Sequence, residues 1–138
     1  MLLPLLTALA VLTPLSSDVD QARLTALFAG GVETAVITSA QKKPGATVGN
    51  ARRWRGDACS SGVQIALPGL PPLTYDLQWA RARVDYQQGG REVVLKGAAP
   101  PTRVPVATAL TFRFADERTA RAAALAMNRL KTACTPQR

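Results

Sequence analysis

The most regular alternation of apolar and polar positions lies between Pro105 and Phe114, and a helical pattern follows it directly. Asp116 has a side chain suited to a helix N-cap, and Glu117 adds negative charge to the first turn. A period of two predicts a half-buried strand, and spacings of three and four predict an amphipathic helix that packs on a sheet. The strand face carries Val106, Thr108, Leu110, Phe112 and Phe114, and the helical stripe carries Ala120, Ala123, Met127, Leu130 and Cys134.

A hairpin is predicted at Gly89 and Gly90, because glycine tolerates positive φ at both positions of a two-residue turn. Folding the chain about this turn brings apolar residues opposite apolar ones on one face. On the other face it opposes two cations, which is unfavourable unless Asp85 or an external anion lies nearby. The predicted pairs are Tyr86 with Val93, Val84 with Leu95, and Arg83 with Lys96.

The segment 73–86 also alternates, but the phase of its apolar residues changes at Trp79 and Ala80. One extra residue at that point would restore a single apolar face, which predicts a long strand with a β-bulge. The alternative is two separate strands, although no turn residues stand there. The expected polar face would pair its acids and arginines at the surface, namely Asp76, Asp85, Arg81 and Arg83.

The first half of the chain predicts shorter elements. Ser17 fits the N-cap of a short helix, with Asp20 three residues later, and Gly30 and Gly31 end that helix. Strands are expected at Val32–Thr38 and Val63–Leu67, an exposed loop at Gln41–Asn50, and a stiff proline-rich connector at Pro68–Pro72.

Strands that follow one another without intervening helices predict an antiparallel meander. The fold class is therefore α+β: a small two-layer domain, in which a short N-terminal helix and a longer C-terminal helix pack on one face of the sheet. Its 138 residues suit one domain, which we expect to span residues 18–138.

Residues 1–17 predict an export signal peptide. The run to Leu15 is almost wholly apolar but is short for a helix that spans a bilayer, and small residues follow it. Cleavage near Ser16, Ser17 or Asp18 would leave a mature chain with no transmembrane span, in the periplasm or secreted. The alternative is a buried N-terminal segment, for which Pro4 and Pro14 are poorly suited.

The charge balance is basic, with 17 Lys and Arg against 9 Asp and Glu, a formal net charge of +8. This excess favours anionic partners, although a composition imposed by a GC-rich genome is an equally simple explanation. The chain contains no histidine. That excludes histidine-based catalytic triads, histidine metal ligands and the usual general base near neutral pH.

Cys59 and Cys134 are the only two cysteines. In an oxidising compartment each has one intramolecular partner, which predicts a disulfide between them. The segment 56–62, which contains Cys59 and Ser60, resembles a nucleophile loop in composition, but no histidine base exists to activate it, and nothing in the sequence places a lysine base there. We therefore expect no catalytic residues, and the acids show no spacing that indicates a metal or cofactor site.

The candidate binding residues are Arg52, Arg53, Trp54 and Arg55, the densest cationic cluster in the chain. Arginine forks bind phosphate or carboxylate at two points, and a tryptophan can stack on a base or a sugar. The simpler alternative places Trp54 in the core, with Arg53 and Arg55 solvated on the opposite face of a strand.

These patterns predict a small exported domain of the bacterial cell envelope that is not an enzyme. It would bind another protein, or an anionic envelope polymer or lipid, through its basic surface. A nucleic-acid-binding module, whose N-terminal segment only resembles a signal, is the alternative.

Overall fold

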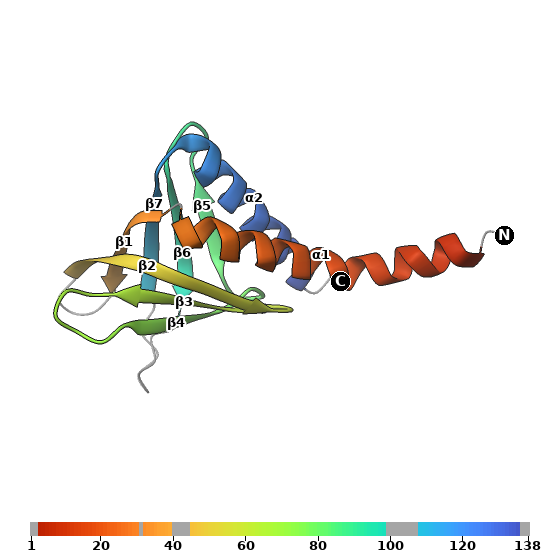
Figure 1. Ribbon diagram of the computed structural model, residues 1–138, viewed down its shortest axis with the longest axis horizontal. Coiled ribbons are helices and arrows are strands. Elements are labelled where there is room, and N and C mark those ends of the chain that lie inside the picture. The colour runs from red at the N-terminus through yellow and green to blue at the C-terminus, as the bar shows by residue number, and fades with distance from the viewer. Residues whose placement is uncertain (1–2, 31, 40–44, 99–107, 136–138) are drawn as a thin grey trace.

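The computed structural model describes residues 3–30, 32–39, 45–98 and 108–135, with side chains from residue 17 onward except those of 39, 45–47, 52 and 108. The described strands form one antiparallel sheet of seven strands in the order β4-β3-β2-β1-β7-β6-β5 (Figure 1). Two helices pack against this sheet, so the predicted α+β class is confirmed. The elements are α1 (Leu3–Gly30), β1 (Val32–Ser39), β2 (Gly45–Asp57), β3 (Ser60–Ala66), β4 (Leu73–Gln78), β5 (Arg83–Tyr86), β6 (Glu92–Ala98), β7 (Thr108–Phe114) and α2 (Glu117–Cys134).

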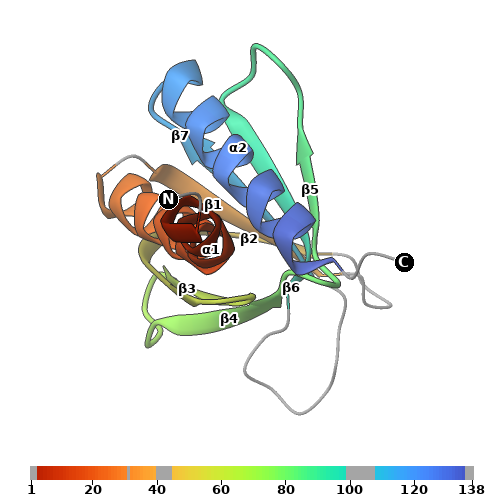
Figure 2. The same ribbon diagram turned by 90° about the vertical axis from the view of Figure 1, so that its right-hand side faces the viewer.

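The sheet is strongly curled, and both helices lie in its concave side (Figures 1 and 2). Strands β2, β3 and β4 run at a steep angle to β5, β6 and β7. Helix α1 packs mainly on β2, α2 packs on β5, β6 and β7, and the two helices contact each other. The sheet therefore has one face turned to the helices and one turned outward.

Phe28 of α1 joins the two halves of the core. Its ring centroid lies 4.7 Å from that of Trp54 on β2, and 4.9 Å and 5.6 Å from those of Phe112 and Phe114 on β7. The contacts with β7 are edge-to-face, an arrangement that aromatic rings favour. Because one side chain contacts both halves, the position of α1 is tied to the curl of the sheet.

The C-terminal strand and helix form as predicted. Asp116 is the N-cap of α2, and its Oδ1 accepts a hydrogen bond of 2.7 Å from the backbone N–H of Thr119. This bond favours the ionised carboxylate and lowers the pKa of Asp116. The predicted buried face is present at Ala120, Ala123, Met127 and Leu130 on the helix and at Leu110, Phe112 and Phe114 on the strand, whereas Val106 lies outside the described residues.

The hairpin between β5 and β6 has the predicted register, with Tyr86 opposite Val93 and Arg83 opposite Lys96. Its turn is wider than two residues: Gly90 N–H donates to the carbonyl of Gln87, and the strand pairing ends at Tyr86. Lys96 Nζ lies 3.0 Å from Asp85 Oδ2. This ion pair offsets the repulsion between the two opposed cations.

The prediction of one bulged strand over residues 73–86 is wrong, and the two-strand alternative is correct. After β4 the N–H groups of Arg81 and Ala82 both donate to the carbonyl of Gln78 at 2.9 Å, which forms a tight turn. Trp79 and Ala82 are fully buried in this turn. The turn carries the chain from β4, at one edge of the sheet, to β5, at the other.

The loop predicted at Gln41–Asn50 is also corrected, because β2 begins at Gly45 and pairs with β1 through Gly49. Residues 41–44 of that prediction lie outside the described residues. A Cβ at Gly49 would lie 2.6 Å from the carbonyl oxygen of Ala66. This glycine permits close backbone approach within a strand and does not mark a loop.

Helix α1 runs continuously from Leu3 to Gly30, so Ser17 lies inside it and is not an N-cap. In Figure 1 the first part of α1 extends beyond the sheet and the second part lies across it. The described contacts with the core come from that second part, which corresponds to the short helix predicted after residue 17. Among the described residues, no helix is both long enough and apolar enough to cross a membrane.

Candidate binding site on the outer face of β2, β3 and β4

Alternation along β2 directs Trp54 into the core and its neighbours Arg53 and Arg55 to the outer face. Trp54 is fully buried, whereas both arginines are exposed. The indole Nε1–H of Trp54 donates to Gln21 Oε1 of α1 at 3.0 Å. This hydrogen bond holds the tryptophan on the helix side of the sheet.

Gln21 is the centre of a buried polar network that sequence reasoning missed. Its Oε1 also accepts a 2.8 Å hydrogen bond from Ser61 Oγ, and Ser61 Oγ accepts a 2.8 Å bond from Trp79 Nε1. Gln21 Nε2 donates to the carbonyls of Ala58 and Ser60 at 3.2 Å. Among the described side chains, every buried polar atom has a partner. The network anchors α1 to the β2–β3 turn and to both buried tryptophans.

Cross-strand register arranges the outer face in rows. Arg53 lies opposite Gln64, which lies opposite Thr74, and these three side chains share one row. The next row contains Arg55, Gly62 and Asp76. Alternate residues on a strand are roughly 7 Å apart, so the two guanidinium groups start from neighbouring rows on the same strand.

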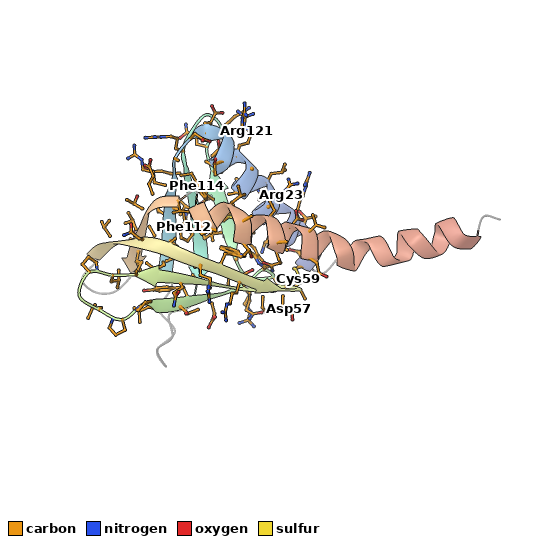
Figure 3. All side chains as sticks on the ribbon, in the orientation of Figure 1. Arg23, Asp57, Cys59, Phe112, Phe114 and Arg121 are labelled. Atoms are coloured by element: carbon orange, nitrogen blue, oxygen red, sulfur yellow. A yellow bond between two sulfur atoms is a disulfide. The ribbon has the colours of Figure 1, made fainter. Side chains whose placement is uncertain are left out.

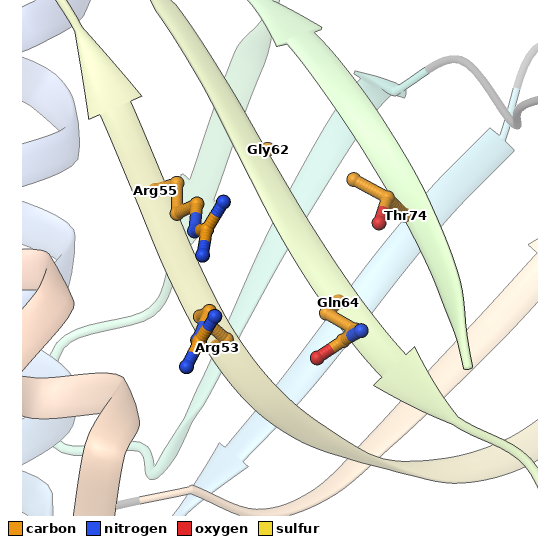
Figure 4. A pocket seen from close by; sticks show the side chains of 5 residues that line it. All are labelled: Arg53, Arg55, Gly62, Gln64 and Thr74. Atoms are coloured by element: carbon orange, nitrogen blue, oxygen red, sulfur yellow. The ribbon is translucent and has the colours of Figure 1, made fainter.

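A groove of about 310 Å³ lies between these rows (Figure 4). Figure 4 shows Arg53 and Arg55 rising from β2, with Gln64 on β3 and Thr74 on β4 across from them. Gly62 forms the floor, because it has no side chain to fill the space. The groove thus offers two guanidinium groups, one amide and one hydroxyl to a ligand.

Neither Arg53 nor Arg55 forms an ion pair within the described part of the chain. The ion pairs there join Lys96 to Asp85, Arg113 to Glu33, Arg121 to Glu117 and Arg129 to Asp20. A guanidinium group carries five N–H donors in a planar fork that matches carboxylate and phosphate. Within the described residues, the two arginines of the groove therefore keep their donors for an external anion.

The predicted binding cluster is only partly brought together at the surface. Trp54 cannot contact a ligand, because its side chain lies in the core, as the alternative interpretation placed it. The side chain of Arg52 lies outside the described residues. Arg53 and Arg55 stay candidate binding residues, and the structure adds Gly62, Gln64, Thr74 and Asp76 beside them.

The positions of Gln64, Thr74 and Asp76 could have been anticipated from their phase. Each occupies a polar position that alternates with buried residues on its strand. The missing information was the pairing of β2 with β3 and of β3 with β4. The expected grouping of Asp76 with Arg81 and Arg83 fails, because Arg81 lies in the turn after β4 and Arg83 on the opposite edge strand.

The predicted disulfide is present between Cys59 and Cys134, with the Cα atoms 5.6 Å apart. It joins the β2–β3 turn to the last residue of α2 (Figure 3). The backbone N–H of Trp79 donates to the carbonyl of Cys59 at 3.0 Å, so the same turn is also held by the chain leaving β4. Both sulfur atoms are consumed in this bond, so neither is a free nucleophile.

Asp20 is a buried carboxyl between the two helices and does not act in a capping box. Its Oδ1 lies 3.9 Å from Arg129 Nη1 of α2. Burial raises the pKa of Asp20, and the charges of Arg129 and Arg23 oppose that rise. The carboxyl lies between α1 and α2, on the side of the sheet away from the groove.

This chain matches no protein-family model, no curated protein and no solved structure. In the described part of the chain, no three His, Cys, Asp or Glu side chains are grouped so that they could hold a metal ion. The strongest candidate site is therefore the groove that carries Arg53 and Arg55.

Proposed function

We propose that this protein is an exported, non-enzymatic domain of the bacterial cell envelope that binds an anionic envelope component. Arg53 and Arg55 would make the principal contacts. The observation that supports this best is the position of two exposed arginines side by side over a groove, without an ion-pair partner among the described residues. Gln64 and Thr74 add neutral donors within the same groove.

Nucleic acid is a weaker candidate partner. Single-stranded nucleic acids are bound by cationic grooves in which aromatic side chains stack on the bases. Trp54 was the aromatic residue that the sequence offered for this role, and it is buried together with Trp79. An anion that is bound through guanidinium, amide and hydroxyl groups fits the groove better.

Export is supported by the disulfide, because such bonds form and persist outside the reducing cytosol. The described contacts of α1 are compatible with removal of the signal. The described residues of α1 that are buried are Asp20, Gln21, Leu24 and Phe28, all after the expected cleavage region. Removal of residues 1–17 would leave these contacts intact.

Intact-mass measurement of the protein recovered from its native host tests export. We expect a mature chain that begins near Ser16, Ser17 or Asp18, together with the mass change of one disulfide. Recovery from the periplasm or the medium should accompany that mass. A chain that starts at Met1 and stays in the cytosol would contradict the proposed location.

The double substitution Arg53→Gln and Arg55→Gln tests the anion site. A cation close to an anionic surface contributes about 1 kcal/mol, so losing two should weaken binding to anionic lipid vesicles roughly 30-fold. The slope of binding against salt concentration should also flatten, since fewer counterions are released. Vesicle co-sedimentation at several salt concentrations measures both effects.

The matched control is Arg118→Gln with Arg121→Gln, which makes the same change in net charge on the first turns of α2. We expect this control to weaken binding only about two- to threefold through the lower net charge. Equal losses in the two double variants would mean that net charge alone drives binding, and the groove would have no special role.

A further inference from the structure

We propose that the ligand of this groove is an acidic sugar, a pyranose ring that carries a carboxylate and neighbouring hydroxyl groups. This inference rests on the proposed anion-binding function and names the class of anion. The feature that points to it is Asp76, which lies in the same cross-strand row as Arg55, with Gly62 between them.

Beside the groove, Asp76 forms a rim whose charge is opposite to that of Arg53 and Arg55. Arg53 and Arg55 stand on β2, and Asp76 stands on β4, with β3 between. A Cβ on Gly62 would lie 3.5 Å from Asp76 Oδ1, so this carboxylate borders the floor of the groove. No described cation forms an ion pair with Asp76. Within the described residues, its oxygens are thus left to accept hydrogen bonds from a ligand.

This arrangement distinguishes between two kinds of anionic ligand. A polyanion that carries charge on every unit and no hydroxyl groups along its chain, such as polyphosphate, would bring negative charge towards Asp76 and be repelled there. An acidic sugar would instead place its carboxylate over the arginines and its hydroxyl groups over Asp76. A carboxylate accepts hydroxyl hydrogen bonds about twice as strong as those of a neutral acceptor. The Asp76 rim thus favours a ligand with one anionic end and one hydroxyl-bearing end.

The remaining lining groups suit the same ligand. The Gln64 amide can both donate and accept, and so can the Thr74 hydroxyl, as the hydroxyl groups of a sugar require. Gly62 leaves its position on β3, the middle strand, without a side chain, so a flat ring can approach the backbone of β3. A Cβ there would also lie 3.3 Å from Thr74 Cγ2 and would raise the floor of the groove.

The test compares two probes, tetragalacturonate and inorganic polyphosphate, on the disulfide-bonded mature chain by isothermal titration calorimetry. For Asp76→Ala we expect tetragalacturonate to bind about tenfold more weakly, through the loss of one charge-assisted hydrogen bond. We expect polyphosphate to bind about threefold more tightly, because a repelling charge is removed. The control is Asp18→Ala, which makes the same change in charge at an exposed acid on α1. It should change the binding of either probe by no more than about twofold.

Gly62→Ala gives a second, independent test. The added methyl group should weaken the binding of tetragalacturonate about fivefold, because it occupies the floor of the groove. The binding of polyphosphate, which the arginines hold, should be unaffected. A variant that failed to fold would lose the binding of both probes. A change in the binding of one probe alone, or opposite changes for the two, would therefore report on the groove itself.

Two results would overturn the inference without contradicting the proposed anion site. These are binding of polyphosphate but not tetragalacturonate by the unaltered protein, or an Asp76→Ala variant that binds tetragalacturonate as well as, or better than, the unaltered protein. Failure of the proposed function has a different signature. In that case Arg53→Gln with Arg55→Gln would leave the binding of both probes unchanged.

Discussion

Replacing Cys59 and Cys134 together with serine is expected to lower the free energy of unfolding by up to roughly 4 kcal/mol. The bond closes a loop over a sequence separation of 75 residues, and opening it increases the conformational entropy of the unfolded chain. That loss is a large share of the 5–15 kcal/mol typical of a folded domain. The melting temperature should fall by roughly 5–15 °C, as calorimetry would measure.

The loss should begin at the end of α2, because Cys134 ties the last turn of that helix to the β2–β3 turn. Hydrogen exchange would show this as faster exchange at the Thr135 N–H, which donates to the carbonyl of Lys131. Reduction of the unaltered protein provides the matched control and should reproduce the serine variant. An unchanged melting temperature, or two free thiols in freshly prepared protein, would contradict this role of the bond.

Gln21→Met should destabilise the protein by about 2–4 kcal/mol. Methionine has a similar length but cannot accept the hydrogen bonds from Trp54 Nε1 and Ser61 Oγ, which measure 3.0 Å and 2.8 Å. Each buried donor left without a partner costs about 1–3 kcal/mol. Chemical denaturation followed by tryptophan fluorescence measures both the stability and the environment of the two indoles.

Gln87→Met is the control for that substitution. Gln87 is an exposed glutamine in the turn after β5, so the same chemical change there should stay within about 0.5 kcal/mol. If the two substitutions had equal effects, the buried network would contribute little. Gln21 has a further constraint, because a Cβ on Gly56 would overlap its side-chain amide. Gly56→Ala should therefore disturb the same network from the β2 side.

Where neighbouring residues set the structure, the sequence was sufficient to predict it. The β5–β6 register followed from Gly89 and Gly90 together with apolar residues that match across the turn. The end of β7 and the start of α2 followed from Asp116, whose carboxylate caps the helix within its own first turn. The disulfide followed from the presence of only two cysteines and an expected oxidising compartment.

The predictions that failed concern positions whose structure is set by residues far away in the sequence. Tryptophan is not a typical turn residue. Trp79 nevertheless lies in a turn, because its ring is buried and its Nε1–H donates to Ser61 Oγ. Gly49 belongs to a strand because the backbone of Ala66 approaches it closely. The phase of β2 could place Trp54 inward, but only the pairing of three strands shows that Arg55 and Asp76 border one groove.

The junction between β1 and β7 has a consequence for the order of folding. β1 pairs with β2 early in the chain, but its other edge is covered by β7, which follows every other described strand. A growing chain therefore carries β1 with one open edge, and Val36 and Ile37 lie in a strand that is not yet enclosed. Such edges recruit other strands, and pairings between distant segments form slowly. The incompletely synthesised protein is thus the form most exposed to aggregation and most in need of a chaperone.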